Sequence, residues 1–78
     1  MEMEIVYQLP EAVYVNLTIY NSLGYKIRTL ITRNQNAGRY IVHWDGCDEH
    51  GKDATSGIYV YRLETSKYSD AKKMLLVK

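Results

Sequence analysis

The strongest constraint in this sequence is the period of two in its apolar residues. Between Ala12 and Tyr20, every second residue is aliphatic, and the residues between them are polar or tyrosine. A strand points successive side chains to opposite faces, whereas a helix repeats about every 3.6 residues. The pattern therefore predicts a strand with one aliphatic face. Its aliphatic members are Val13, Val15, Leu17 and Ile19.

Other short stretches show the same kind of alternation. The predicted strands are Ile5–Leu9, Ala12–Tyr20, Lys26–Thr32, Tyr40–Trp44, Ile58–Glu64 and Lys72–Lys78. Segments rich in glycine and polar residues separate them, which is typical of turns and loops. These segments are Asn21–Gly24, Asn34–Gly38, Asp45–Gly57 and Ser66–Asp70. We therefore predict an all-β fold, a small antiparallel immunoglobulin-like β-sandwich of about six to seven strands.

One predicted strand departs from strict alternation. In Lys26–Thr32 the apolar residues Ile27, Leu30 and Ile31 do not fall on one face. An extra residue in a strand shifts the alternation, so we expect a β-bulge or a twisted edge strand here.

Length and charge limit the classes of function. The chain has 78 residues, which suits one domain near the lower limit for a self-sufficient core. Its net charge of +1 disfavours nucleic acid as a partner, and no apolar run is long enough for membrane insertion. The start, Met1–Glu4, lacks the basic residues and apolar stretch of a signal peptide. We expect residues 1–78 to form a single module of a larger protein.

The predicted loop Asp45–Gly57 contains the densest group of acidic residues. Several convergent oxygens would suit calcium, although the spacing does not match an EF-hand loop. The alternative is a long connection in which acidic side chains accept hydrogen bonds from nearby backbone amides. The candidate residues are Asp45, Asp48, Glu49, His50 and Asp53. The latter interpretation is favoured, and no cofactor is expected.

The histidines and the single cysteine offer no recognisable reactive centre. Neither His43 nor His50 has a nucleophile or a paired carboxylate at a known spacing. Cys47 lies among acidic residues, which should raise its pKa and lower its reactivity. We expect a chain that is not an enzyme.

The sequence contains eight tyrosines and no phenylalanine. Exposed tyrosines could stack on sugars, but tyrosine is also a common strand residue at half-buried positions. The candidates for a carbohydrate-binding face are Tyr14, Tyr20, Tyr25, Tyr59, Tyr61 and Tyr68.

The last predicted strand permits two interpretations. An edge strand offers unpaired N–H and C=O groups that another chain can capture. Alternatively, its lysines are the charged residues that protect an edge from aggregation. The strand consists of Lys72, Lys73, Met74, Leu75, Leu76, Val77 and Lys78.

Several segments, in order, resemble a known group of domains. They are Leu9-Pro10-Glu11, Leu17–Gly24, Ala37–Tyr40 leading into Trp44-Asp45-Gly46, Ser56–Leu63 and Lys72–Lys78. Together they resemble the C-terminal sorting domain of type IX secretion cargo and the related Ig-like domain of the flagellar hook-capping protein FlgD. The resemblance implies structural roles for Trp44, which would pack inside, and for Asp45, which would close the loop. It implies structural roles for Gly46, Gly57, Tyr59 and Tyr61 as well.

The resemblance implies a non-catalytic domain at the C-terminus of a larger exported bacterial protein. As a sorting signal, the domain would be recognised by the type IX translocon, with Lys72–Lys78 as its recognition strand. The alternative is a structural Ig-like assembly module that contacts a neighbouring domain; a carbohydrate-binding module ranks below both. Under these interpretations the protein would be secreted or displayed on the bacterial surface, and would travel through the periplasm.

Overall fold

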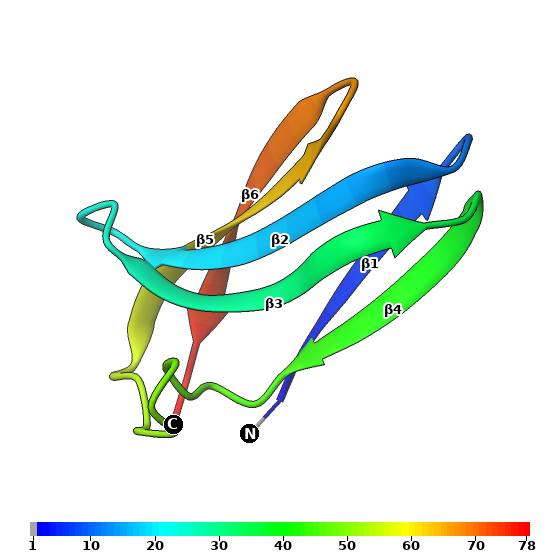
Figure 1. Ribbon diagram of the computed structural model, residues 1–78. Coiled ribbons are helices and arrows are strands. Elements are labelled where there is room, and N and C mark those ends of the chain that lie inside the picture. Colours follow the sequence, from blue (N-terminus) through cyan, green and yellow to red (C-terminus); the bar gives the residue numbers. More distant parts are fainter. Residues whose placement is uncertain (1) are drawn as a thin grey trace.

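The computed structural model describes residues 2–78, and Met1, the first residue of the segment compared with signal peptides, lies outside the described residues. Within them the chain forms six strands and no helix (Figure 1). The strands are β1 (Met3–Leu9), β2 (Val13–Asn21), β3 (Lys26–Gln35), β4 (Gly38–Trp44), β5 (Gly57–Thr65) and β6 (Ser69–Leu76). No helix in this part of the chain is long and apolar enough to cross a membrane.

The strands form two antiparallel sheets. One sheet contains β1 and β4, and the other has the order β3-β2-β5-β6. Figure 1 shows β1 and β4 as a separate layer beside the curved β2 and β3. The predicted all-β, immunoglobulin-like sandwich is therefore confirmed.

The core lies between the sheets and follows the period of two. Val15, Leu17 and Ile19 of β2 have no exposed surface. Burying each such side chain contributes about 1.5–3 kcal/mol. The opposite sheet contributes Ile5 and Trp44, which are also buried. The remaining buried hydrophobic residues are Tyr7, Leu9, Val13, Ile31, Tyr59, Leu63 and Leu76.

Two bulges explain the broken alternation of β3. Leu17 pairs with Ile31 but Thr18 pairs with Thr29, so Leu30 is an extra residue. A second register shift leaves Ile27 without a partner. The bulge prediction is confirmed, and the strand is also the edge of its sheet.

The predicted turn Asn34–Gly38 was too long. β3 continues to Gln35 and β4 begins at Gly38, which has a φ of 149°. Gln35 is buried, and its side-chain oxygen accepts a 2.6 Å hydrogen bond from the Tyr7 hydroxyl. This polar residue is part of the core because its partner lies on the opposite sheet.

The last strand also differs from its predicted range. β6 begins at Ser69 and ends at Leu76, so Val77 and Lys78 lie outside it. The strand begins with two polar residues, Ser69 and Asp70, which the sequence pattern assigned to the preceding connection. Its position at the edge of the four-stranded sheet agrees with the expectation of an edge strand.

Candidate functional site

The loop after β4 is fixed to the core by Trp44. The indole has no exposed surface, and its Nε1–H donates a 2.9 Å hydrogen bond to the Cys47 carbonyl. The ring also packs edge-on against Tyr59, with 5.3 Å between centroids. Tyr59 in turn donates from its hydroxyl to the Thr55 carbonyl at 2.6 Å. Both ends of the loop are thereby attached to two aromatic residues of the core.

Asp45 closes the first turn of the loop. Its Oδ1 accepts hydrogen bonds from the Cys47 backbone amide at 3.0 Å and from the Arg28 guanidinium at 2.8 Å. The Cys47 amide and, after it, Arg28 hold the pKa of Asp45 below its ordinary value. Gly46 completes the turn with a φ of 79°, in the region that favours glycine.

Lys78 joins the end of the chain to this loop. Its Nζ donates to the Gly46 carbonyl and to Asp53 Oδ1, each at 3.1 Å. An added Cβ at Gly46 would lie 3.0 Å from that Nζ. The hydrogen bond from Lys78 is the largest cause of the lowered pKa of Asp53. Lys78 therefore belongs to the loop closure, although the sequence placed it in the recognition strand.

The loop acids contact protein groups and do not converge on a metal site. Asp48 Oδ1 accepts from the backbone amides of Lys52 and His50, which lower its pKa in that order. The Glu49 carboxylate accepts from the Thr29 amide. Among residues 2–78, no group of three or more His, Cys, Asp or Glu residues could hold a metal ion. The contacts match the interpretation in which acidic side chains satisfy the turns of a long loop.

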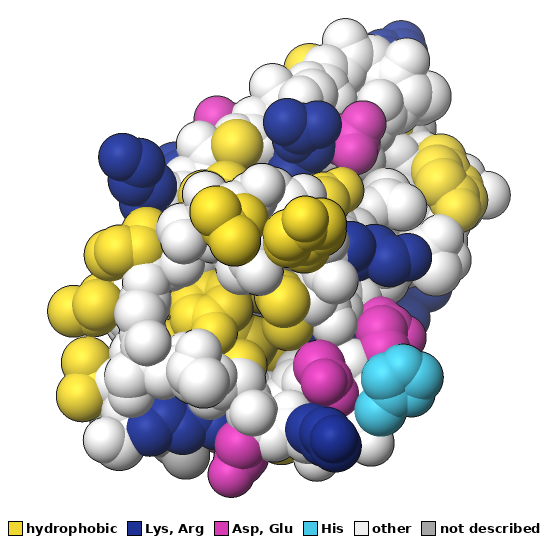
Figure 2. Space-filling model, turned by 90° about the vertical axis from the view of Figure 1, so that its left-hand side faces the viewer, with side chains coloured by type: hydrophobic (Ala, Val, Ile, Leu, Met, Phe, Trp, Pro, Cys, Tyr) yellow, Lys and Arg dark blue, Asp and Glu magenta, His cyan; other side chains and the backbone are white. Residues whose placement is uncertain are grey.

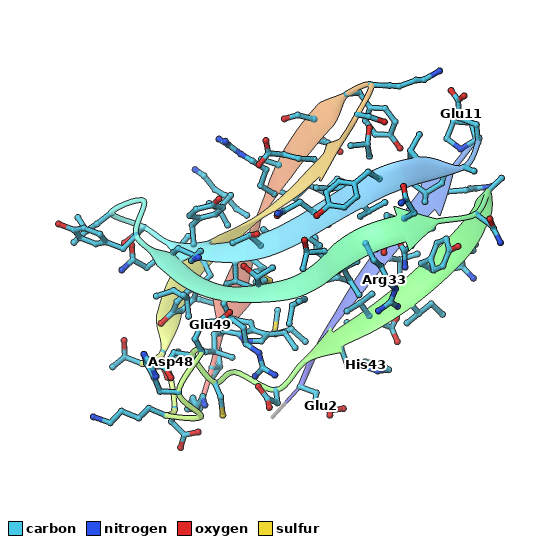
Figure 3. The ribbon with its side chains drawn as sticks, viewed as in Figure 1. Glu2, Glu11, Arg33, His43, Asp48 and Glu49 are labelled. Carbon is cyan, nitrogen blue, oxygen red and sulfur yellow. The ribbon has the colours of Figure 1, made fainter. Side chains whose placement is uncertain are left out.

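The two histidines lie in different parts of the fold, His43 in a strand and His50 in the loop after it. His43 is on β4, with its Nε2 3.5 Å from Glu4 on the exposed side of the small sheet. Figure 3 shows it separated from Asp48 and Glu49 in the loop.

The pKa of the Cys47 thiol is raised, first by partial burial and then by Asp45 and Asp53. The expected direction is confirmed, but burial was not part of the sequence argument.

The six candidate tyrosines do not share one face. Tyr59 is buried and Tyr61 half-buried on the inner side of β5. Tyr14 and Tyr20 lie on the outer side of β2, where Arg62 stacks over the Tyr20 ring at 5.8 Å. The remaining two, Tyr25 and Tyr68, lie in the turns that follow β2 and β5. These tyrosines therefore do not form the shared carbohydrate-binding face that the sequence suggested.

Apolar side chains do gather at another place, the end of the molecule that carries the β2–β3 turn. Leu23 in the turn and Ile58 at the start of β5 border one hollow of about 170 Å³. Ile58 also pairs with Leu75 of β6. Figure 2, viewed from this side, shows hydrophobic side chains gathered on the surface. We call Leu23, Ile58 and Leu75 the outer patch. The sequence pattern did not predict this patch, although Leu23 is an apolar residue in an otherwise polar turn.

The loop contacts predict a loss of stability in acid. The pKa values of Asp45, Asp48 and Asp53 lie below the ordinary 3.8 in the folded chain. Their contribution is therefore present above pH 3.8 and lost as the pH falls through the lower folded values. We expect the free energy of unfolding, measured by urea denaturation, to fall between about pH 5 and pH 2. In Asp45→Asn this fall should be smaller, and an equal fall in both proteins would contradict the assignment.

Comparisons with known proteins agree with this architecture. The family model of the FlgD Ig-like domain matches residues 1–69. The solved structure of FlgD from P. aeruginosa matches with a TM-score of 0.76 and 22% sequence identity. That match covers 96% of this chain and 58% of the P. aeruginosa chain, so the present chain spans little more than half of it. A comparison with curated proteins found no match. These findings support the structural Ig-like interpretation and give no support to the type IX sorting domain.

Proposed function

Because the chain belongs to the FlgD Ig-like domain family, we propose that it is a non-catalytic structural module of a longer, exported bacterial protein. In this role it packs against a neighbouring part of the same protein in an extracellular or surface-associated assembly. The relative from P. aeruginosa, a FlgD protein, supports this proposal because its chain extends well beyond the matching part. The outer patch is the observation that carries the proposal.

The outer patch has the properties of a contact surface. Leu23 is 80% exposed, Leu75 56% and Ile58 46%. Single exposed apolar residues are common, but grouped ones favour an interaction site. Leu23 and Ile58 line one hollow, and Leu75 lies beside Ile58 in the neighbouring strand. Val60 extends the apolar surface along β5, beside a second hollow of about 320 Å³ that is also lined by Arg62. An apolar centre with a charged rim is typical of protein–protein contacts.

Charge placed in the outer patch should release the module from its neighbour. We expect Leu75→Glu in the full-length gene product to increase the radius of gyration measured by small-angle X-ray scattering. Ile41→Glu is the matched control, because Ile41 is 50% exposed but lies on the outer face of the other sheet. An unchanged radius in Leu75→Glu, an equal increase in both variants, or a gene product that consists of these 78 residues alone would contradict the proposal.

The sorting signal is kept as a second proposal because β6 is an edge strand with an exposed outer face. Deleting Lys73–Lys78 would not test it, since the deletion removes the buried Leu76. Lys73→Glu keeps the core and changes only an exposed position. Fused to an exported reporter in a host with a type IX system, the domain should then lose export. Unchanged export of that variant would count against the sorting role.

A further inference from the structure

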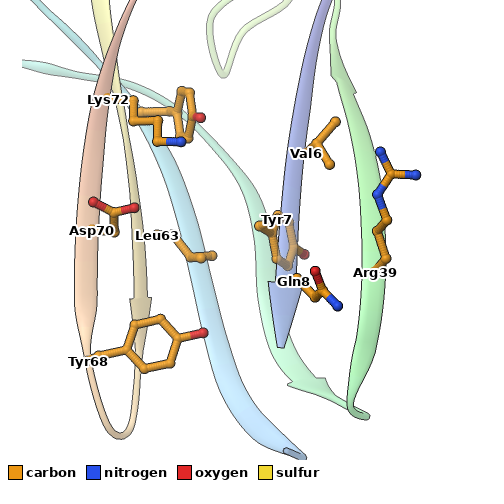
Figure 4. A pocket seen from close by; sticks show the side chains of 9 residues that line it. Val6, Tyr7, Gln8, Arg39, Leu63, Tyr68, Asp70 and Lys72 are labelled. Carbon is orange, nitrogen blue, oxygen red and sulfur yellow. The ribbon is translucent and has the colours of Figure 1, made fainter. Parts of the chain in front are cut away.

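We propose that the groove between β1 and β6 binds an extended, acidic segment of a partner protein, which adds a third strand to the β1–β4 sheet. The groove has a volume of about 330 Å³. Figure 4 shows it between β1 and β4 on one side and the β5–β6 hairpin on the other. It is separate from the outer patch, so this proposal goes beyond the structural role proposed above.

Both strands that border the groove have an unpaired edge. Within residues 2–78, β1 pairs only with β4, and β6 pairs only with β5. Each strand therefore has a row of backbone N–H and C=O groups without a ladder partner. Such an edge accepts an extended peptide through main-chain hydrogen bonds.

The two sheets differ in their number of strands, and one added strand would reduce the difference. Two strands face four, whereas a seven-stranded immunoglobulin sandwich places three or four strands in each sheet. The smaller sheet leaves the inner side of β5 and β6 partly uncovered. Tyr61 remains half-buried there, and its partner in β6, Lys72, is exposed.

The lining of the groove suits alternating side chains. Tyr7, Tyr61, Leu63 and Tyr68 contribute apolar surface. A strand beside β1 would direct every second side chain toward this surface, because successive residues point to opposite sides. The apolar residues of the partner segment should therefore occur at every second position.

The charges favour an acidic segment. Arg39 and Lys72 line the groove, and neither takes part in the ion pairs formed among residues 2–78. The one acid in the lining, Asp70, accepts a hydrogen bond from the Ala71 amide. Lys72 is also a charge that protects an edge from aggregation. An uncharged strand would leave this lysine without a partner, whereas an acidic strand can pair with it. The charge therefore favours an acidic partner.

The test uses a designed probe and two adjacent lysines. The probe is a blocked seven-residue peptide with threonine at the even positions and valine or glutamate at the odd positions. Its glutamates therefore lie on the same side as its valines, toward Tyr61 and Lys72. A second peptide has lysine in place of glutamate. In ¹⁵N NMR titrations of the 78-residue chain, the acidic peptide should shift the amide signals of β1 and β6. Lys72→Glu should weaken its binding by about tenfold. Lys73→Glu, which makes the same change in net charge on the opposite face of β6, should leave the affinity unchanged.

The titrations also distinguish an acidic peptide in the groove from other occupants and other edges. Equal binding of both peptides, equal weakening by both variants, or no shift at about 1 mM peptide would overturn the proposal. Among the described strands, β3 and β4 also have an unpaired edge. Shifts confined to either of these strands would place the peptide there and would also overturn the proposal. Concentration-dependent shifts without any peptide would identify a second copy as the occupant instead. None of these results bears on the outer patch, so the structural role would stand or fall separately.

Discussion

Trp44→Ala is expected to lower the free energy of unfolding by about 3–5 kcal/mol, the range for large aromatic residues in a core. Trp44 has no exposed surface, and it holds both Cys47 and Tyr59. Since small domains have a total stability of only about 5–15 kcal/mol, the variant should be partly unfolded at 37 °C. Urea denaturation followed by far-ultraviolet circular dichroism measures the change without depending on the indole fluorescence.

Trp44→Phe separates packing from the hydrogen bond. The phenyl ring keeps much of the contact with Tyr59 but cannot donate to the Cys47 carbonyl. We expect an intermediate loss of stability, because both ring volume and one hydrogen bond are removed. A stability of Trp44→Ala within about 1 kcal/mol of the parent chain would contradict the central position of this residue.

Leu76→Ala should lower the free energy of unfolding by about 2–5 kcal/mol, because a buried leucine leaves both lost contacts and a cavity. Its neighbour Leu75 is the matched control, since the same substitution there occurs on the opposite face of β6. Leu76 is fully buried and Leu75 is 56% exposed. Leu75→Ala should change stability by less than about 0.5 kcal/mol. Equal losses in the two variants, measured by the same urea titration, would show that the register of β6 is wrong.

These stability predictions bear on how β6 can function. A strand that is captured whole by a translocon would have to give up Leu76 from the core and the contacts of Lys78 with the loop. An added strand at an edge requires no such loss, because β6 keeps its pairing with β5. Recognition through an exposed edge or face is therefore compatible with a folded domain.

Local patterns accounted for the strands and even for an irregularity. Alternation predicts a half-buried strand because the pleat itself assigns each residue to a face. Ile27 and Leu30 broke the alternation of β3, and they are the two residues that the register leaves unpaired. The polar start of β6 was missed because Ser69 and Asp70 have the composition of a turn, and only pairing with β5 makes them a strand.

Long-range contacts account for what sequence reasoning could not reach. Gln35 is buried because Tyr7, 28 positions away, donates to it. Lys78 reaches Gly46 across 32 positions, so its role in closing the loop left no local signal. The groove beside β1 depends on how two sheets of unequal size face each other, which no single segment encodes.

Hydroxyl-radical footprinting of the full-length gene product tests most directly whether this domain acts through contact with a neighbour. The method reports the exposure of individual side chains, and Ile41 serves as an internal reference that is 50% exposed. We predict that Leu23, Ile58 and Leu75 are oxidised much more slowly than Ile41, because the neighbouring part of the protein covers them. Oxidation of all four in proportion to their exposure in the isolated fold would contradict the account.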